Sequence, residues 1–115
     1  MNLDEAFSKH AEWKVKFRTA ISKQETLDAA TIGKDDCCAL GTWLHGAGRA
    51  RFNGQAAFTD LVAKHRTFHA EAGKVAKLIN DKKFAEADKA LESGTSYAAA
   101  SSQVGIAISS LKKIA

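Results

Sequence analysis

Residues 55–80 read QAAFTDLVAKHRTFHAEAGKVAKLIN, and this stretch decides the fold. Its apolar residues recur at spacings of three and four, which is the period of one face of an α-helix. The spacing predicts one long amphipathic helix whose apolar face contains Phe58, Leu61, His65, Phe68, Ala72, Val75 and Ile79. His65 and His69 lie one helical turn apart and point toward the core, so one nitrogen of each can reach a single metal ion.

The composition indicates a helical protein with one core. The chain has 115 residues, no proline and 8% aromatic residues. A chain of this length buries one core, so we expect a single domain over residues 1–115. The absence of proline and the abundance of alanine favour helices over a β-sandwich or barrel. We therefore predict an all-α fold, an antiparallel four-helix bundle.

The charge pattern argues against nucleic acid as a partner. The formal net charge is +4, from 17 Lys and Arg against 13 Asp and Glu, but the basic residues are scattered among acidic ones. A nucleic-acid-binding domain concentrates its positive charge on one face or combines it with stacking aromatic residues. We expect a solvated surface of mixed sign instead.

Targeting signals and cysteine usage predict a cytoplasmic protein. The first residues, MNLDE, lack the basic start and apolar run of a signal peptide, and no segment approaches the ~20 apolar residues of a membrane span. The two cysteines, Cys37 and Cys38, are adjacent, and a disulfide between neighbours is strained and closes almost no loop. They indicate thiols in a reducing compartment, either free or bound to metal.

A first helix is predicted over residues 3–23, with an apolar stripe of Leu3, Phe7, His10, Trp13, Phe17, Ala20 and Ile21. One histidine, His10, therefore occupies a core position. After a break at Gly33, Asp35 and Asp36 are N-cap candidates for a short helix over residues 37–45. This short second helix carries Cys38 in its first turn, where the helix dipole favours a thiolate.

The rest of the chain predicts two long helices. A loop over residues 46–54 leads to the helix described first, with Asn53 as its cap. Asp81 predicts the start of a fourth helix almost at once, so the last two helices form an antiparallel hairpin. The run Ser-Gly-Thr-Ser at 93–96 predicts a bend in that helix and not a break. The small residues at 98–105 permit close packing against a neighbouring helix or a second subunit.

The histidines and a cysteine predict a metal site. A zinc protease needs Glu directly after the first histidine of the pair, and Arg66 occupies that position here. His10 lies on a stripe that a bundle turns toward His65 and His69, and Cys38 supplies a soft ligand. Three imidazoles and one thiolate suit Zn²⁺ and leave no position for water or substrate. We expect a protein that holds or senses metal and is not an enzyme.

Two further residues compete for this site. Cys37 is as near the start of the short helix as Cys38, and local reasoning does not choose between them. His45 lies at the end of the same helix beside Gly46, a position that is typical of a cap or of a cation facing solvent.

Three motifs together resemble the chemoreceptor zinc-binding (CZB) domain family. They are His-Ala-Glu-Trp-Lys at 10–14, Cys-Ala-Leu-Gly-Thr-Trp-Leu at 38–44 and His-Arg-Thr-Phe-His at 65–69, followed by Ala-Glu-Ala-Gly at 70–73. The resemblance covers nearly the whole chain, and it implies that His10, Cys38, His65 and His69 bind one zinc ion. Cys37 and His45 fall outside the pattern.

The same resemblance implies a role in bacterial signalling. Such domains are cytoplasmic four-helix units, often dimeric, in chemoreceptors and diguanylate cyclases. There, zinc occupancy or oxidation of the zinc-bound cysteine alters the signal. The implied partners are a second copy of the chain and a signalling protein in cis or in trans. The chain departs from the family pattern in one respect, because no output domain is visible in it.

Two alternatives belong to other classes. A haemerythrin-like oxygen carrier is also a helical bundle with metal, but its di-iron site needs core carboxylates. Glu12, Asp60 and Glu71 lie off the predicted apolar stripes. A structural adaptor bundle with buried histidines is the second alternative, and its stability would not depend on metal.

Overall fold

The computed structural model describes residues 3–115, and every regular element in this range is an α-helix. Three helices are long: α1 (Leu3–Lys23), α5 (Ala56–Asn80) and α7 (Ser96–Ile114). Four are short: α2 (Ala29–Ile32), α3 (Ala39–His45), α4 (Ala47–Phe52) and α6 (Phe84–Ala90). The all-α prediction is confirmed.

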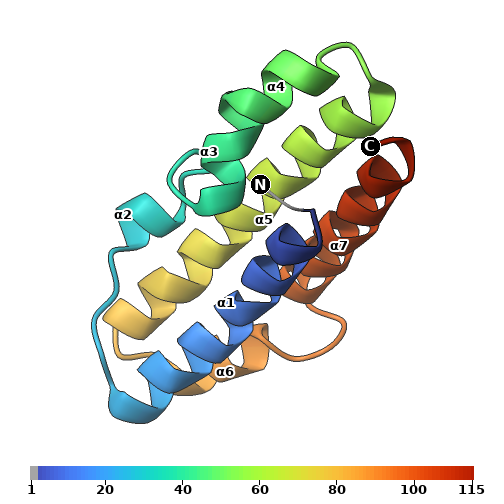
Figure 1. The fold of residues 1–115 in the computed structure, drawn as a ribbon. Helices are drawn as coiled ribbons and strands as arrows, with labels where there is room; N and C mark the ends of the chain where they lie inside the picture. The colour runs from blue at the N-terminus through green and yellow to red at the C-terminus, as the bar shows by residue number, and fades with distance from the viewer. Residues whose placement is uncertain (1–2) are drawn as a thin grey trace.

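The helices form an antiparallel bundle, in which a column is one long helix or a row of short helices that follow one another (Figure 1). Helices α1 and α5 run in one direction, whereas α7 runs the opposite way beside them. The short helices α2, α3 and α4 follow one another along the other flank of α5 and also run opposite to it. The second column of the antiparallel bundle is therefore made of three short helices in place of one long helix.

The long helix α5 supplies the centre of the core. Its predicted apolar face is confirmed, since every residue on it is buried: Phe58, Leu61, His65, Phe68, Ala72, Val75 and Ile79. The helix begins after Gln55, its N-cap, and ends at Asn80. The helix α5 packs against α7, α1 and α2, and it therefore serves as the scaffold to which the other columns attach.

Three local predictions were wrong. Phe7 is not in the core but is 48% exposed, on the side of α1 that faces α7. Residues 46–54 form helix α4 in large part, and Asn53 ends that helix instead of capping α5. Asp81 ends α5, and the next helix begins only at Phe84.

The fourth helix is broken and not bent. Gly94 adopts a positive φ of +83°, a conformation that favours glycine and interrupts a helix. Thr95 then caps α7, because its hydroxyl oxygen accepts a hydrogen bond from the backbone N–H of Ala98 at 3.2 Å. These two residues separate the short α6 from α7.

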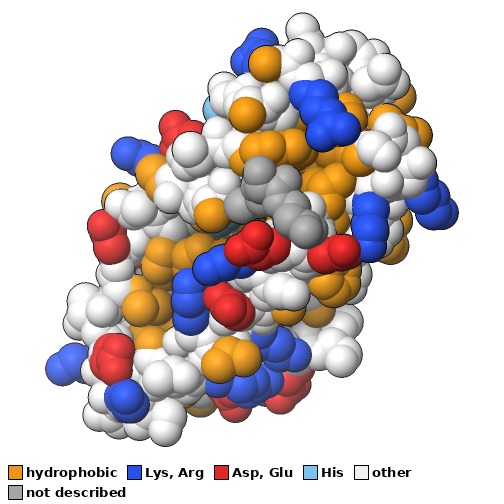
Figure 2. Space-filling view, viewed as in Figure 1, with side chains coloured by type: hydrophobic (Ala, Val, Ile, Leu, Met, Phe, Trp, Pro, Cys, Tyr) orange, Lys and Arg blue, Asp and Glu red, His pale blue; other side chains and the backbone are white. Residues whose placement is uncertain are grey.

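The surface has the mixed charge that the sequence predicts. Figure 2 shows basic and acidic side chains interspersed on one face, with hydrophobic side chains between them. Within residues 3–115, no helix combines the length and the hydropathy that crossing a bilayer requires.

Candidate metal centre

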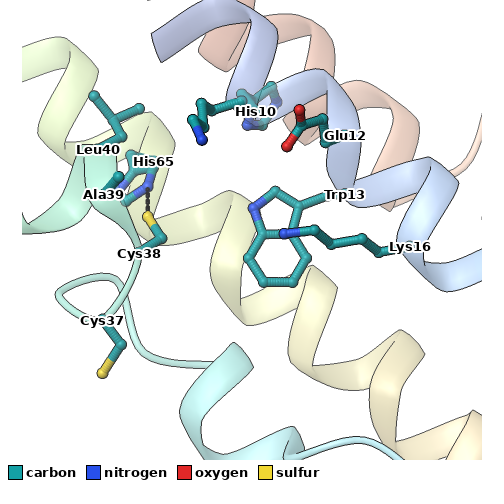
Figure 3. A pocket seen from close by; sticks show the side chains of 10 residues that line it. His10, Glu12, Trp13, Lys16, Cys37, Cys38, Ala39, Leu40 and His65 are labelled. Carbon is teal, nitrogen blue, oxygen red and sulfur yellow. Dashed lines mark hydrogen bonds between the residues drawn. The ribbon is translucent and has the colours of Figure 1, made fainter. Parts of the chain in front are cut away.

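Three predicted ligands meet between α5 and the start of α3. The Cys38 Sγ atom lies 3.2 Å from Nε2 of His65 and 3.4 Å from Nε2 of His69. The two Nε2 atoms are 3.0 Å apart, and both histidines are only 1% exposed. All three ligand atoms lie within 4.8 Å of one another. Figure 3 shows the contact between Cys38 and His65. A single small cation between these atoms would contact all three.

The backbone of α2 determines which nitrogen of His69 carries the proton. Nδ1 of His69 lies 2.7 Å from the carbonyl oxygen of Ile32. A carbonyl oxygen only accepts hydrogen bonds, so Nδ1 donates and Nε2 of the neutral ring keeps its lone pair. That lone pair faces Cys38 and His65. A second hydrogen bond of this kind orients most metal-binding histidines.

A close approach of two glycines brings α2 to this position. A Cβ on Gly73 of α5 would lie 3.0 Å from the Cα of Gly33, at the end of α2. The two backbones can approach so closely because Gly73 has no side chain, whereas a Cβ on Gly33 would make only ordinary contact with Gly73, at 3.9 Å. Ile32 precedes Gly33, and its carbonyl therefore reaches His69.

Burial keeps both histidines neutral. It lowers the pKa of His65 to about 3, with a further contribution from the neighbouring histidines His69 and His10. Burial also lowers the pKa of His69, against the effect of its hydrogen bond to Ile32. Neutral imidazole is the form that binds metal, so the protein presents these two rings ready for coordination.

The prediction of a thiolate at Cys38 was wrong for the protein alone. Cys38 precedes α3 as its N-cap, and its Sγ accepts a hydrogen bond from the backbone N–H of Gly41 at 3.2 Å. Burial nevertheless raises the pKa of Cys38 and outweighs this hydrogen bond. The side chain is therefore a thiol at neutral pH unless a nearby cation favours the thiolate.

The donor set fits zinc. One sulfur and two imidazole nitrogens form the ligand set that zinc prefers, and a bound cation would offset the burial that now raises the Cys38 pKa. Nδ1 of His65 is buried and has no hydrogen-bond partner within residues 3–115. The polar contacts of the His65 ring are therefore made by Nε2, which faces the cluster.

His10 lies beside the cluster but outside it. Its ring packs edge-on against Phe68, with 4.3 Å between the ring centroids, and its Nε2 lies 3.1 Å from the hydroxyl of Ser101 on α7. Burial lowers its pKa to about 4. His10, Cys38 and His65 line one cavity of about 350 Å³ (Figure 3). The structure thus places the fourth predicted ligand across this cavity from Cys38 and His65, outside the cluster of three.

The competing residues point elsewhere. The Cys37 thiol is exposed and donates to the Asp36 carboxylate at 3.4 Å, and Figure 3 shows it directed away from His65. His45 lies with Nε2 3.4 Å from the carboxylate of Asp35. Neither side chain belongs to the cluster.

Sequence reasoning missed the role of Asp35, which was expected to cap a helix. Its carboxylate lies 3.4 Å from His45 and 3.7 Å from Nε of Arg66, which follows His65 on α5. Its backbone carbonyl packs against Gly41, where a Cβ would overlap it. Gly41 therefore leaves the space that this close approach of the Asp35 backbone needs.

Comparison with known families agrees with this geometry. A family model described as the chemoreceptor zinc-binding domain matches residues 10–76, more than half of the chain. The chain belongs to the chemoreceptor zinc-binding domain family. The expected resemblance is confirmed, and zinc is the ion for which the cluster of this CZB domain is suited. Searches of curated proteins and of solved structures gave no match.

The carboxylates of the di-iron alternative do not belong to the cluster of this CZB domain, although Glu12 lines the cavity beside it. Glu12 and Asp60 are exposed, and Asp60 lies 4.0 Å from Lys64. Glu71 accepts a hydrogen bond from Lys74 at 3.2 Å. The metal-binding cluster within residues 3–115 consists of sulfur and nitrogen ligands. A haemerythrin-like site therefore has no support in the described part of the chain.

Proposed function

We propose that this CZB domain is a zinc-responsive sensor of bacterial signal transduction, in which His10, Cys38, His65 and His69 bind one Zn²⁺. One observation carries the proposal: Sγ of Cys38 contacts both Nε2 atoms, while the Ile32 carbonyl holds His69 in the tautomer that binds metal. A site with four protein ligands is closed to substrate, which favours sensing over catalysis.

The proposed signal is a change in the segment that carries Cys38. Cys38 at the start of α3 and the two histidines of α5 would hold the zinc ion, whose positive charge would favour the Cys38 thiolate. Without that link, Cys38 holds its place through a hydrogen bond from Gly41 and weak contacts with the histidines. Residues 36–45 then become free to move between Gly33 and Gly46, which can absorb backbone changes.

Oxidation of Cys38 is a second way to give the same signal. The Cys38 side chain lines the cavity of about 350 Å³ and is partly exposed, so a small peroxide can reach it. The thiolate sulfur takes one oxygen atom from hydrogen peroxide, forming a sulfenic acid and releasing hydroxide. The sulfenic acid is a poorer ligand, and the link to α5 weakens.

The proposed output is chemotaxis or cyclic-di-GMP control in the cytoplasm, through a chemoreceptor or cyclase in cis or in trans. A homodimer is part of the same proposal. Phe7 on α1 is 48% exposed and Ile106 on α7 is 67% exposed, and both line one open groove. Exposed apolar side chains in a groove favour contact with another helix.

A zinc titration of the chelator-treated protein, with and without a mild oxidant, tests this function. We expect one zinc per chain, a gain in helix content or thermal stability, and weaker binding after oxidation. Cys38→Ser should lower the affinity and abolish the oxidant response while the long helices persist. Cys37→Ser is the matched control and should behave as the unsubstituted chain does.

Two results would contradict the proposal. Stability that does not change on chelation would favour the structural bundle. Metal analysis that finds two iron ions and visible absorption would favour the oxygen carrier.

A further inference from the structure

His10 lies between two cavities, and this position has a consequence for metal binding. One cavity, of about 350 Å³, separates it from Cys38 and His65. The other is a groove of about 500 Å³ between α1 and α7, which His10 lines together with Ser101 and Gly105. His10 is only 9% exposed, so its hydrogen bond with Ser101 and its packing against Phe68 hold the orientation of the ring.

The His10 ring contacts Ser101, on the groove side, through its Nε2 atom. Nε2 is also the atom that His65 and His69 direct toward the cluster. His65 and His69 meet through their Nε2 atoms, whereas Nε2 of His10 lies 3.1 Å from the Ser101 hydroxyl. One nitrogen cannot bind a cation through its lone pair and share a hydrogen with Ser101 in the same direction. The cavity beside Cys38 gives the ring space in which to turn.

We propose that Ser101 competes with zinc for His10, so that Ser101 lowers the zinc affinity and transmits metal occupancy to α7. This inference rests on the proposed function, in which His10 is the fourth ligand. When His10 turns toward the cluster, the only hydrogen bond that the described residues show between its ring and α7 is broken. The released hydroxyl can bond to the backbone carbonyl one turn earlier, at Tyr97, as serine commonly does inside helices.

The consequence reaches the surface of the groove. His10 and Ser101 line the same groove as the exposed side chains Phe7 and Ile106. Gly105 lies against the Phe7 ring, since a Cβ there would be 3.1 Å from it. Loss of the hydrogen bond between His10 and Ser101 therefore changes the packing of α1 against α7 beside the exposed side chains of Phe7 and Ile106.

The test is the direction in which Ser101→Ala changes the zinc affinity, measured by titration against a chelator of known affinity. If Ser101 competes with the metal, its removal frees His10 and zinc binds roughly 2- to 10-fold more tightly, as expected for one hydrogen bond. If Ser101 instead supports His10 as a ligand, with the other ring nitrogen on the metal, zinc binds roughly 10- to 100-fold more weakly.

Two further variants isolate the effect. Ser102→Ala is the matched control, because Ser102 is exposed on the same helix and has the same gain in helix propensity. Its zinc affinity should be unchanged. In a His10→Ala background, Ser101→Ala should also have no effect. Zinc should shift the amide NMR signals of residues 101–105 in the unsubstituted chain and much less in His10→Ala.

The outcomes separate this inference from the proposed function. Tighter binding in Ser101→Ala alone, dependent on His10, supports the competition. Weaker or unchanged binding in Ser101→Ala, with binding still lost in His10→Ala, overturns the competition and leaves the four-ligand site intact. Unchanged affinity in His10→Ala overturns the fourth ligand and the competition together.

Discussion

The two sides of the metal centre are built differently. His65 and His69 project from the middle of a 25-residue helix and are buried to the same degree as the core around them. Cys38 is partly exposed and precedes a seven-residue helix, after a turn without regular structure. The histidines are therefore placed by the core itself, whereas Cys38 is placed by a few contacts that single substitutions can remove.

Cys38 is held in place by contacts between the turn before it and Gly41 after it. The backbone carbonyl of Asp35 packs on Gly41, and the backbone N–H of Gly41 donates to Cys38. The Asp35 carboxylate lies near Arg66 on α5. The difference between the two sides leads to four predictions, ordered here from the largest effect to the smallest.

His69→Ala should have the largest effect on zinc binding. The substitution removes a ligand from the side that the core places, and no neighbouring group can replace it. We expect the zinc affinity to fall more than roughly 100-fold, beyond the loss that is typical when only a hydrogen-bond partner of a metal ligand is removed. The fall should be at least as large as in Cys38→Ser. The measurement is a chelator-competition titration, with helix content followed by circular dichroism.

His45→Ala is the control for this variant, because His45 lies outside the cluster and contacts Asp35. Its zinc affinity should stay close to that of the unsubstituted chain. A loss of less than tenfold in His69→Ala would contradict the assignment of His69 as a ligand.

Acid should lower the stability of the metal-free protein through its buried histidines. In the unfolded chain each histidine takes up a proton near pH 6.5, whereas burial lowers the folded pKa of His10 to about 4. The contribution of neutral His10 to stability is thus complete above about pH 6.5 and is lost as the pH falls toward 4. For His10 the loss is on the order of 3 kcal/mol. The raised pKa of Cys38 keeps it a thiol throughout this range.

Urea unfolding at pH 7 and pH 4.5, in the presence of a chelator, measures this loss. His10→Gln should show a smaller decrease than the unsubstituted chain, because glutamine does not take up the proton. The same decrease in both proteins would show that carboxylates, and not His10, account for the acid sensitivity.

Gly41→Ala should disturb the cysteine side. Its Cβ would overlap the Asp35 carbonyl, so the turn at 33–38 has to move. We expect a loss of roughly 1–3 kcal/mol in the free energy of unfolding, as for other overpacked sites. The zinc affinity should fall roughly tenfold or more, because Cys38 moves with the turn. Unchanged affinity with lower stability would show that Cys38 is placed independently of this contact.

Asp35→Asn should have the smallest effect. It keeps the backbone packing on Gly41 and removes only the charge beside His45 and Arg66, which are both exposed. Exposed ion pairs contribute up to about 1 kcal/mol, so the zinc affinity should fall no more than roughly 5-fold. Asp36→Asn is the matched control, since Asp36 contacts Cys37 instead. A larger fall in Asp35→Asn would make this carboxylate a main support of the site.

The sequence predicts the histidine side better than the cysteine side. The face of α5 follows from helical periodicity, and the structure buries every residue of it. The bounds of α1 and α5 also agree with the predictions to within one residue. Periodicity predicts less over residues 24–54, because short helices contain too few turns to show an apolar stripe.

Long-range contacts account for the other differences. The contact of His69 with Ile32 joins residues 37 positions apart, and that of His10 with Ser101 joins residues 91 positions apart. No local pattern encodes either partner. Phe7 fits the apolar period of α1, yet it is exposed because the neighbouring α7 presents Gly105 and small side chains there. A helical period shows which residues share a face, and only the packing shows how far that face is covered.

The approach of Gly33 and Gly73 extends the set of residues on which the metal site depends. Neither glycine touches a ligand atom, but together they set the distance at which the Ile32 carbonyl meets His69. A methyl group on Gly73 would lie 3.0 Å from the Cα of Gly33 and would push the two backbones apart. The proton of His69 would then lose its acceptor, and the ring could present its protonated nitrogen to the cluster. Coordination chemistry at this centre thus depends on Gly73, a position that contributes no side chain at all.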